Sequence, residues 1–207
     1  MATFFPLLRL IYCNFFKRLK EYDMIEITLI GRGGQGIVVA GDILAKALFY
    51  QGFFVKSFPA FGTERRGAPV KSFLRVSHER IKESYQIYKP DYYVIFDSIQ
   101  ANGLPLGVNG LVNAPEFKTI HHLNCLDANK IAVKNRLGSP TNPIINTTML
   151  GGLAGLLEEL DFHNLERAIQ ETLPAHLLKK NMDSAFQAYS EMNQKYGEER
   201  YWTLKCA

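Results

Sequence analysis

The 207-residue sequence predicts an α/β protein: a three-layer sandwich with a mixed, mostly parallel sheet and a helical C-terminal part. Three observations predict this fold class. An apolar, β-branched strand leads directly into a glycine-rich loop and then into an amphipathic helix. A near-continuous apolar run in mid-chain is typical of a strand that is covered on both faces of a sheet. After Pro140 and Pro143 the apolar residues recur with helical spacing.

The first 23 residues precede the first convincing strand. They are rich in Phe and Leu and then basic, whereas a signal peptide places its positive charge before the apolar run. Arg9 interrupts the apolar stretch, which is shorter than the about 20 apolar residues that span a bilayer. We therefore interpret residues 1–23 as an accessory or mis-annotated N-terminal extension, and we place one domain in residues 24–207.

The remaining elements follow from local patterns in chain order. Residues 25–30 are predicted to form a strand, and the helix after the glycine loop should end at Gly52. Residues 59–69 are predicted to form a loop, and the segment 80–88 is predicted to pair with 70–76 as a hairpin. Further strands are predicted at 53–58, 70–76, 92–96, 111–112 and 119–123. Further helices are predicted at 126–137, 145–160, 162–173 and 176–196.

GRGGQG at residues 31–36 satisfies the G-x-G-x-x-G pattern between a strand and a helix. Glycines permit close backbone approach, and a helix N-terminus presents free N–H groups to a phosphate. A tight turn without a ligand explains the same pattern. A dinucleotide site also needs a carboxylate about 20 residues further on, but Lys56 and Ser57 lie there, with no carboxylate before Glu64. The candidate ligand-binding residues of this loop are Gly31, Arg32, Gly33, Gly34, Gln35 and Gly36.

A second candidate site is the polar loop PAFGTERRGAP at residues 59–69. It contains Glu64, Arg65 and Arg66, and paired arginines can bind a phosphate or a carboxylate through two hydrogen bonds. The alternative is a salt-bridged loop between subunits, because arginine is also enriched at interfaces.

Other polar residues are weaker candidates. Asp97 ends the mid-chain strand and is first of all interpreted as a capping carboxylate, and the cluster at Asn146, Thr147 and Thr148 as a helix N-cap that could also line a pocket. His121 and His122 are adjacent, so on a strand they face opposite sides and cannot share one metal. No catalytic or metal-binding residue is assigned to this chain.

Composition and cysteine spacing exclude several classes. The net charge is only +4, and the basic residues are spread along the chain, so neither a nucleic-acid nor a membrane partner is expected. The three cysteines are scattered, which excludes an internal iron–sulfur cluster with four ligands and suits a reducing cytoplasm. They are Cys13, Cys125 and Cys206.

Five blocks in colinear order resemble the gamma subunits of pyruvate and related 2-oxoacid:ferredoxin oxidoreductases. The likeness runs from about Met24 to about Tyr196. The blocks are GRGGQG (31–36), FPAFGTERRGAPV (58–70), SYQIYKPDY (84–92), IINTTMLGGLAGL (144–156) and KKNMDSAFQAY (179–189).

The resemblance implies a subunit that is inactive alone, in a cytoplasmic hetero-oligomer that converts a 2-oxoacid and coenzyme A to an acyl-CoA and carbon dioxide while reducing ferredoxin. It implies thiamine diphosphate and Mg at the alpha and beta chains, 4Fe-4S clusters in the delta chain, and coenzyme A handling by the gamma chain. RRGAP favours pyruvate as the substrate. The alternatives are the equivalent subunit of an indolepyruvate or branched-chain enzyme, a free-standing nucleotide-binding oxidoreductase, and a purely structural assembly subunit.

Coenzyme A carries a pyrophosphate and a 3′-phosphate, so several cations beside one glycine turn would suit it. Arg32 lies in the turn, and we expect Lys56, Arg65 and Arg66 to follow the next strand at the same sheet edge.

Overall fold

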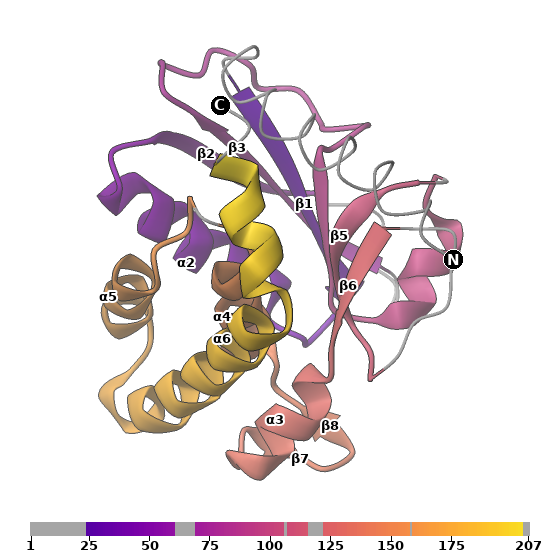
Figure 1. Ribbon diagram of the computed structural model, residues 1–207, viewed down its shortest axis with the longest axis vertical. Coiled ribbons are helices and arrows are strands. Elements are labelled where there is room, and N and C mark those ends of the chain that lie inside the picture. Colours follow the sequence, from indigo (N-terminus) through magenta and orange to yellow (C-terminus); the bar gives the residue numbers. More distant parts are fainter. Residues whose placement is uncertain (1–23, 61–68, 106, 116–121, 158, 205–207) are drawn as a thin grey trace.

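The computed structural model describes residues 24–60, 69–105, 107–115, 122–157 and 159–204, apart from the side chains of residue 122 and of 197–204. They are built around a six-stranded sheet in the order β2-β3-β1-β4-β5-β6 (Figure 1). The neighbouring strands β1, β4, β5 and β6 are parallel to one another, whereas β3 is antiparallel to both β1 and β2. The predicted α/β class with a mixed, mostly parallel sheet is therefore confirmed. The strands are β1 (Met24–Arg32), β2 (Phe54–Ala60), β3 (Pro69–Ser77), β4 (Tyr92–Ile95), β5 (Asn109–Asn113) and β6 (His122–Leu126).

The chain leaves β1 in one direction and β4 in the other. After β1, helix α2 (Ile37–Tyr50) crosses the sheet to β2, with β3 inserted between β1 and β2. The chain after β4 continues instead to β5, on the opposite side of β1. The boundary between β1 and β4 is therefore the topological switch point of the sheet.

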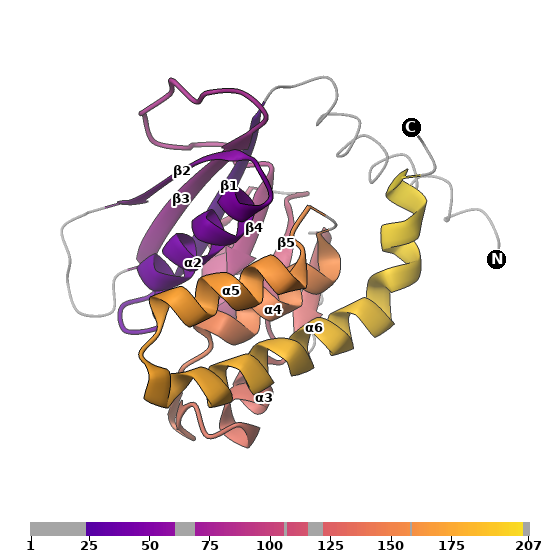
Figure 2. The ribbon, with the colours of Figure 1, turned by 90° about the vertical axis from the view of Figure 1, so that its left-hand side faces the viewer.

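Helices α2, α4, α5 and α6 cover one face of the sheet (Figures 1 and 2). On the opposite face, the short 3-10 helix η1 contributes Ala101 to a second buried cluster with Ile30, Ile95 and Val112. The C-terminal part is helical, as predicted. The remaining elements are η1 (Ser98–Gly103), α3 (Ala128–Lys134), β7 (Gly138–Ser139), β8 (Asn142–Pro143), α4 (Asn146–Leu156), α5 (Phe162–Thr172) and α6 (Ala175–Leu204).

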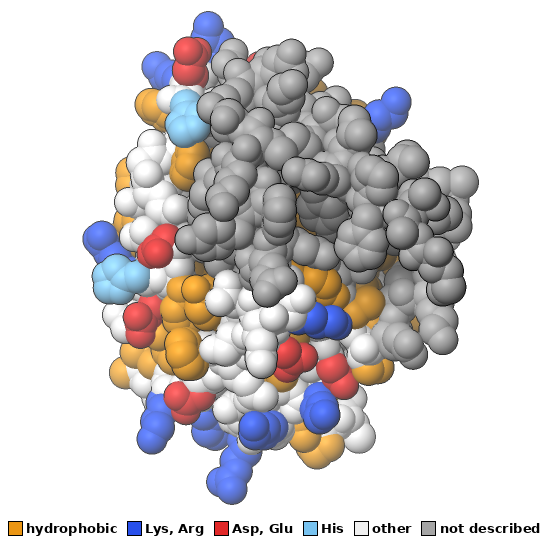
Figure 3. Space-filling view, in the orientation of Figure 1, with side chains coloured by type: hydrophobic (Ala, Val, Ile, Leu, Met, Phe, Trp, Pro, Cys, Tyr) orange, Lys and Arg blue, Asp and Glu red, His pale blue; other side chains and the backbone are white. Residues whose placement is uncertain are grey.

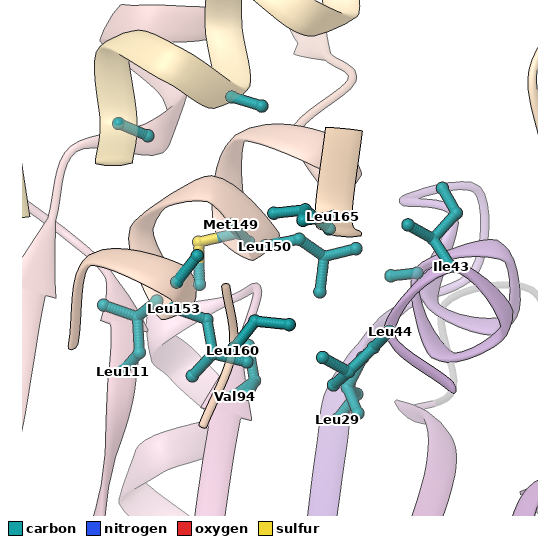
Figure 4. Packing of buried hydrophobic residues seen from close by; sticks show 14 of the residues in the cluster. Leu29, Ile43, Leu44, Val94, Leu111, Met149, Leu150, Leu153, Leu160 and Leu165 are labelled. Atoms are coloured by element: carbon teal, nitrogen blue, oxygen red, sulfur yellow. The ribbon is translucent and has the colours of Figure 1, made fainter. Parts of the chain in front are cut away.

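The main core lies between the sheet and the helical face (Figure 4). Alternate residues of the central strands point into it, and burying each Leu or Ile side chain contributes about 1.5–3 kcal/mol. The absence of a side chain at Gly151 also lets α4 approach α6 closely: a Cβ there would overlap the backbone carbonyl of Ala185. Residues of this core include Leu29, Ile43, Leu44, Val94, Leu111, Met149, Leu150, Leu153, Leu160 and Leu165.

The predicted hairpin between 70–76 and 80–88 is wrong. Both edges of β3 are occupied by β1 and β2, so no edge remains for a further strand. The segment after β3 is instead irregular, and side chains of the sheet bind its backbone. Arg75 Nη1 donates to the Tyr85 carbonyl at 2.8 Å, and Lys56 Nζ donates to the Glu83 carbonyl at 2.9 Å.

Several predicted bounds shift while the element remains. The strand predicted at 119–123 is β6, which begins at His122. The helix predicted at 126–137 is the shorter α3, because the Asp127 side chain accepts a hydrogen bond from Lys130 N at 3.0 Å and caps it. The helix predicted at 145–160 is α4, which ends at Leu156.

Candidate functional site

The glycine loop lies at the switch point of the sheet. β1 runs through Gly31 and Arg32, and α2 begins at Ile37, so the predicted strand–loop–helix unit is confirmed. In open α/β sheets, ligands bind outside the carboxyl ends of the strands at such a point. The fold therefore places the loop where a ligand site is expected.

Gly31 is required by packing. A Cβ there would lie 2.6 Å from Gln35 Oε1, 2.7 Å from Ile37 Cδ1 and 2.8 Å from Phe96 Cβ. The absence of a side chain thus allows β1, the start of α2 and the end of β4 to approach one another.

The other loop glycines have different roles. Gly36 has a φ of 74°, and a Cβ there would lie 2.8 Å from Asn146 Nδ2 on α4. Gly34 has a φ of 92°, which also favours glycine. Gly33, by contrast, has nothing within 4 Å of its Cβ position. Of the loop glycines that the structure describes, Gly33 is the one that leaves both space and unstrained backbone for a ligand.

Arg32 forms an ion pair across the switch point. Its Nε lies 2.7 Å from Asp97 Oδ2, and the Arg32 side chain is 55% exposed whereas that of Asp97 is 7% exposed. Asp97 Oδ1 accepts a hydrogen bond from Ile99 N at 3.2 Å, so its predicted capping role is confirmed at η1. A guanidinium carries five N–H donors. The ion pair therefore orients Arg32 and still leaves donors for an anion.

Amide side chains connect the ends of three parallel strands. Gln35 Oε1 accepts from Arg32 N at 2.7 Å, and Gln35 Nε2 donates to the Phe96 carbonyl at 3.4 Å. Asn113, at the end of β5, donates to the same carbonyl at 3.0 Å and accepts from Asn129 N at 3.3 Å. The sequence reasoning missed Asn113, although a polar residue directly after an apolar strand was the available signal.

Two helices near the loop begin without a side-chain cap. Gly36 occupies the cap position of α2 and Ile145 that of α4, and neither helix has an acidic residue in its first turn. Helices α3 and α5 are capped by Asp127 and Asp161 instead. Free N–H groups and the positive end of the helix dipole favour an anion at α2 and at α4.

The predicted N-cap at residues 146–148 is wrong. The cap position belongs to Ile145, and Asn146 Oδ1 accepts from Thr147 N at 2.9 Å within the first turn. The two threonines are buried and bind α6: Thr147 Oγ1 donates to Asn181 Oδ1 at 2.7 Å, and the hydroxyl of Thr148 lies 2.6 Å from that of Ser184. The sequence reasoning also missed that Asn146 contacts the glycine loop.

Lys56 is not at the glycine loop, so that expectation is wrong. β2 continues through Pro59 to Ala60, and Lys56 pairs with Arg75, which pairs in turn with Glu26. At about 3.3 Å per residue, Glu26 lies about 20 Å from Arg32 along β1. Lys56 thus belongs to the opposite end of the sheet.

Several predicted residues lie outside the described part of the chain. Glu64, Arg65 and Arg66 fall between the end of β2 at Ala60 and the start of β3 at Pro69, which pairs with Arg32. The described residues on either side of them are therefore at the carboxyl edge of β1. The predicted residues that are not described are Glu64, Arg65, Arg66, His121, Cys13 and Cys206.

No group of three or more His, Cys, Asp or Glu that could bind a metal occurs among the described residues. Within the same part of the chain, no helix has both the length and the apolar character to cross a bilayer. Acidic and basic side chains stand side by side over the lower part of the face in Figure 3.

Comparisons with known proteins agree on one family. The family model described as pyruvate ferredoxin/flavodoxin oxidoreductase matches residues 26–191. The chain is 42% identical over 177 residues to pyruvate synthase subunit PorC of Methanothermobacter marburgensis, covering 82% of this chain and 98% of that one. It is 38% identical to the pyruvate/ketoisovalerate oxidoreductases common subunit gamma of Thermococcus litoralis, covering 81% and 97%.

A solved structure has the same fold. The pyruvate oxidoreductase subunit PORC from Thermotoga maritima superposes with a TM-score of 0.66 at 28% identity, covering 81% of this chain and 96% of that chain.

Proposed function

This chain belongs to the pyruvate ferredoxin/flavodoxin oxidoreductase family, as a gamma-type subunit of a 2-oxoacid:ferredoxin oxidoreductase, and we propose that its glycine loop binds coenzyme A. One observation carries the proposal: Gly33 faces open space at the switch point, beside the uncapped N-terminus of α2. Thiamine diphosphate with Mg and the 4Fe-4S clusters belong to the partner chains. The role of this chain is to hold the acyl acceptor.

The chemistry of the loop suits a phosphorylated ligand. Backbone N–H groups at the start of α2 can donate to phosphate oxygens, and Arg32 keeps N–H donors beyond its ion pair with Asp97. Arg65 and Arg66 remain predicted contributors, since their loop begins and ends at this edge. No carboxylate follows β2 at its end to bind a ribose, so coenzyme A is favoured over a nicotinamide dinucleotide.

Gly33→Val tests the proposal. The side chain has room in the fold but fills the space that the ligand needs, so the apparent KM for coenzyme A in the assembled complex should rise at least about tenfold. Dye reduction by the 2-oxoacid without coenzyme A should be unchanged. Gly103, whose Cβ position also has nothing within 4 Å, provides the matched control Gly103→Val. A Gly33→Val complex with a normal coenzyme A response would exclude the loop as the binding site.

The subunit role makes a separate prediction. The purified chain should not reduce a viologen dye with pyruvate and coenzyme A, and activity should appear when alpha, beta and delta chains are added. We propose these chains as its partners in a cytoplasmic complex, with ferredoxin as the electron acceptor of the whole. Turnover by the homogeneous isolated chain would contradict the proposal.

Pyruvate is the proposed substrate, in keeping with the Methanothermobacter relative. A branched-chain 2-oxoacid is the second candidate, because the Thermococcus relative is named as a subunit common to pyruvate and ketoisovalerate oxidoreductases. A gamma chain shared by two enzymes cannot choose between their substrates. Reconstitution of this chain with alpha and beta chains of each type tests whether the substrate preference follows those chains.

A further inference from the structure

Asn146 lies against the glycine loop from another helix. Its side chain is 7% exposed, and its Nδ2 atom lies 2.8 Å from the position of a Cβ on Gly36, the cap residue of α2. Its Oδ1 atom is already used, because it accepts a hydrogen bond from Thr147 N at 2.9 Å. Asn146 therefore presents only its amide N–H donors toward the start of α2.

Those donors have no acceptor among the described residues. Polar groups of largely buried side chains are normally paired, so a free amide donor on a residue that is only 7% exposed is available to an acceptor from outside this part of the chain. The surroundings specify the charge of that acceptor. Both α2 and α4 begin here without a side-chain cap and without an acidic residue in the first turn. The positive ends of the two helix dipoles thus lie beside the same N–H donors.

We infer that Asn146 is a binding residue of the glycine-loop site, donating from Nδ2 to a phosphate oxygen of the ligand at the N-terminus of α2. The inference rests on the proposed coenzyme A site and adds a residue from the C-terminal half of the chain. The loop and α2 supply backbone donors from one side, and α4 supplies a side-chain donor from the other. The ligand then connects two helices that the sequence separates by about a hundred residues.

The test separates binding from stability. Asn146→Asp keeps the shape and the acceptor for Thr147 N, and a carboxylate at a helix N-terminus is favourable, so the thermal midpoint should stay or rise. The same change removes the donor and repels phosphate. Calorimetric titration of the full chain with coenzyme A and with inorganic pyrophosphate should show binding at least about tenfold weaker than that of the wild type. Asn146→Ser, which removes the donor without adding charge, should weaken binding in the same direction.

Thr147→Val is the matched control, since it removes the hydrogen bond to Asn181 on α6. It should lower the thermal midpoint and leave both affinities unchanged. Wild-type affinity in both Asn146 variants would overturn the inference and leave the coenzyme A site intact. Failure of the wild-type chain to bind either ligand would overturn the proposed site as well.

Discussion

The sheet holds two arginine–carboxylate pairs near opposite ends of β1, and their burial is reversed. In the pair of Arg32 and Asp97, the arginine is 55% exposed and the carboxylate 7% exposed, with 2.7 Å between Nε and Oδ2. In the pair of Arg75 and Glu26, the arginine is fully buried and the carboxylate is 21% exposed, with 2.8 Å between Nε and Oε1.

The reversal separates a binding role from a structural one. Arg75 is closed to a ligand by burial: its guanidinium is 0% exposed, donates to the Tyr85 carbonyl, and lies 5.5 and 4.6 Å from the ring centres of Phe58 and Tyr85. At Arg32 the carboxylate is the fixed partner and the cation faces solvent. A third pair on α5, Arg167 and Glu171, is exposed on both sides and provides a surface reference.

The largest effect is expected at the buried arginine. Arg75→Met leaves Glu26 without its cation and releases the Tyr85 carbonyl, so the free energy of unfolding should fall by about 3–5 kcal/mol. The shift of the urea midpoint measures it. The exposed Arg80 lies on the next segment, and Arg80→Met should change the midpoint little. A loss at Arg75 as small as that at Arg80 would remove the distinction between the two ends.

Arg32→Gln should give a smaller stability change and a larger functional one. Asp97 keeps its hydrogen bond from Ile99 N, so the loss of unfolding free energy should be about 1–2 kcal/mol. The apparent KM for coenzyme A should rise about tenfold, as expected for the loss of one charged hydrogen bond. Arg32→Lys keeps the charge and should recover part of the affinity. Unchanged KM values in both variants would assign Arg32 to structure, like Arg75.

The surface pair should give the smallest effect and a dependence on pH. The hydrogen bond from Tyr50, and then the one from Arg167, hold the pKa of Glu171 below its ordinary value of 4.5. A carboxyl group whose pKa is lower in the folded than in the unfolded state stabilises the fold at pH values above its unfolded pKa. This stabilisation is lost as the pH falls through the lower, folded-state pKa. Thermal midpoints between about pH 5 and pH 3 should therefore fall less steeply in Glu171→Gln than in the wild type. Glu166→Gln, on the same helix, is the control, and identical slopes in the two variants would contradict this role for Glu171.

The local structure around the glycine loop could be predicted from the sequence. A strand, a glycine turn and a helix follow one another within about 26 residues, and the motif predicts both this unit and the position of its turn at a strand end. The glycines themselves differ in role, and only the fold reveals it: Gly31 is needed because Phe96, far away in the sequence, lies against it.

The errors come from contacts over long sequence distances. The segment 80–88 has a strand-like pattern, but β3 has no free edge to receive it. Pro59 predicts the end of the strand and so brings Lys56 close to the carboxyl edge, whereas β2 continues to Ala60, because an edge strand tolerates proline. Asn146 reads as a helix cap in the sequence, and its contact with Gly36 depends on how α4 packs beside α2.

The insertion of β3 between β1 and β2 also has a consequence for synthesis. Of these three strands the ribosome synthesises the middle one, β3, last. When Ala60 has emerged, β1 and β2 therefore have no strand between them, although their places in the sheet are about 10 Å apart, two strand spacings. Until residues 69–77 follow, the inner edges of both strands present unpaired N–H and C=O groups. The pairing of this half of the sheet therefore depends on β3, and the unpaired edges of β1 and β2 are open to mispairing until β3 is available.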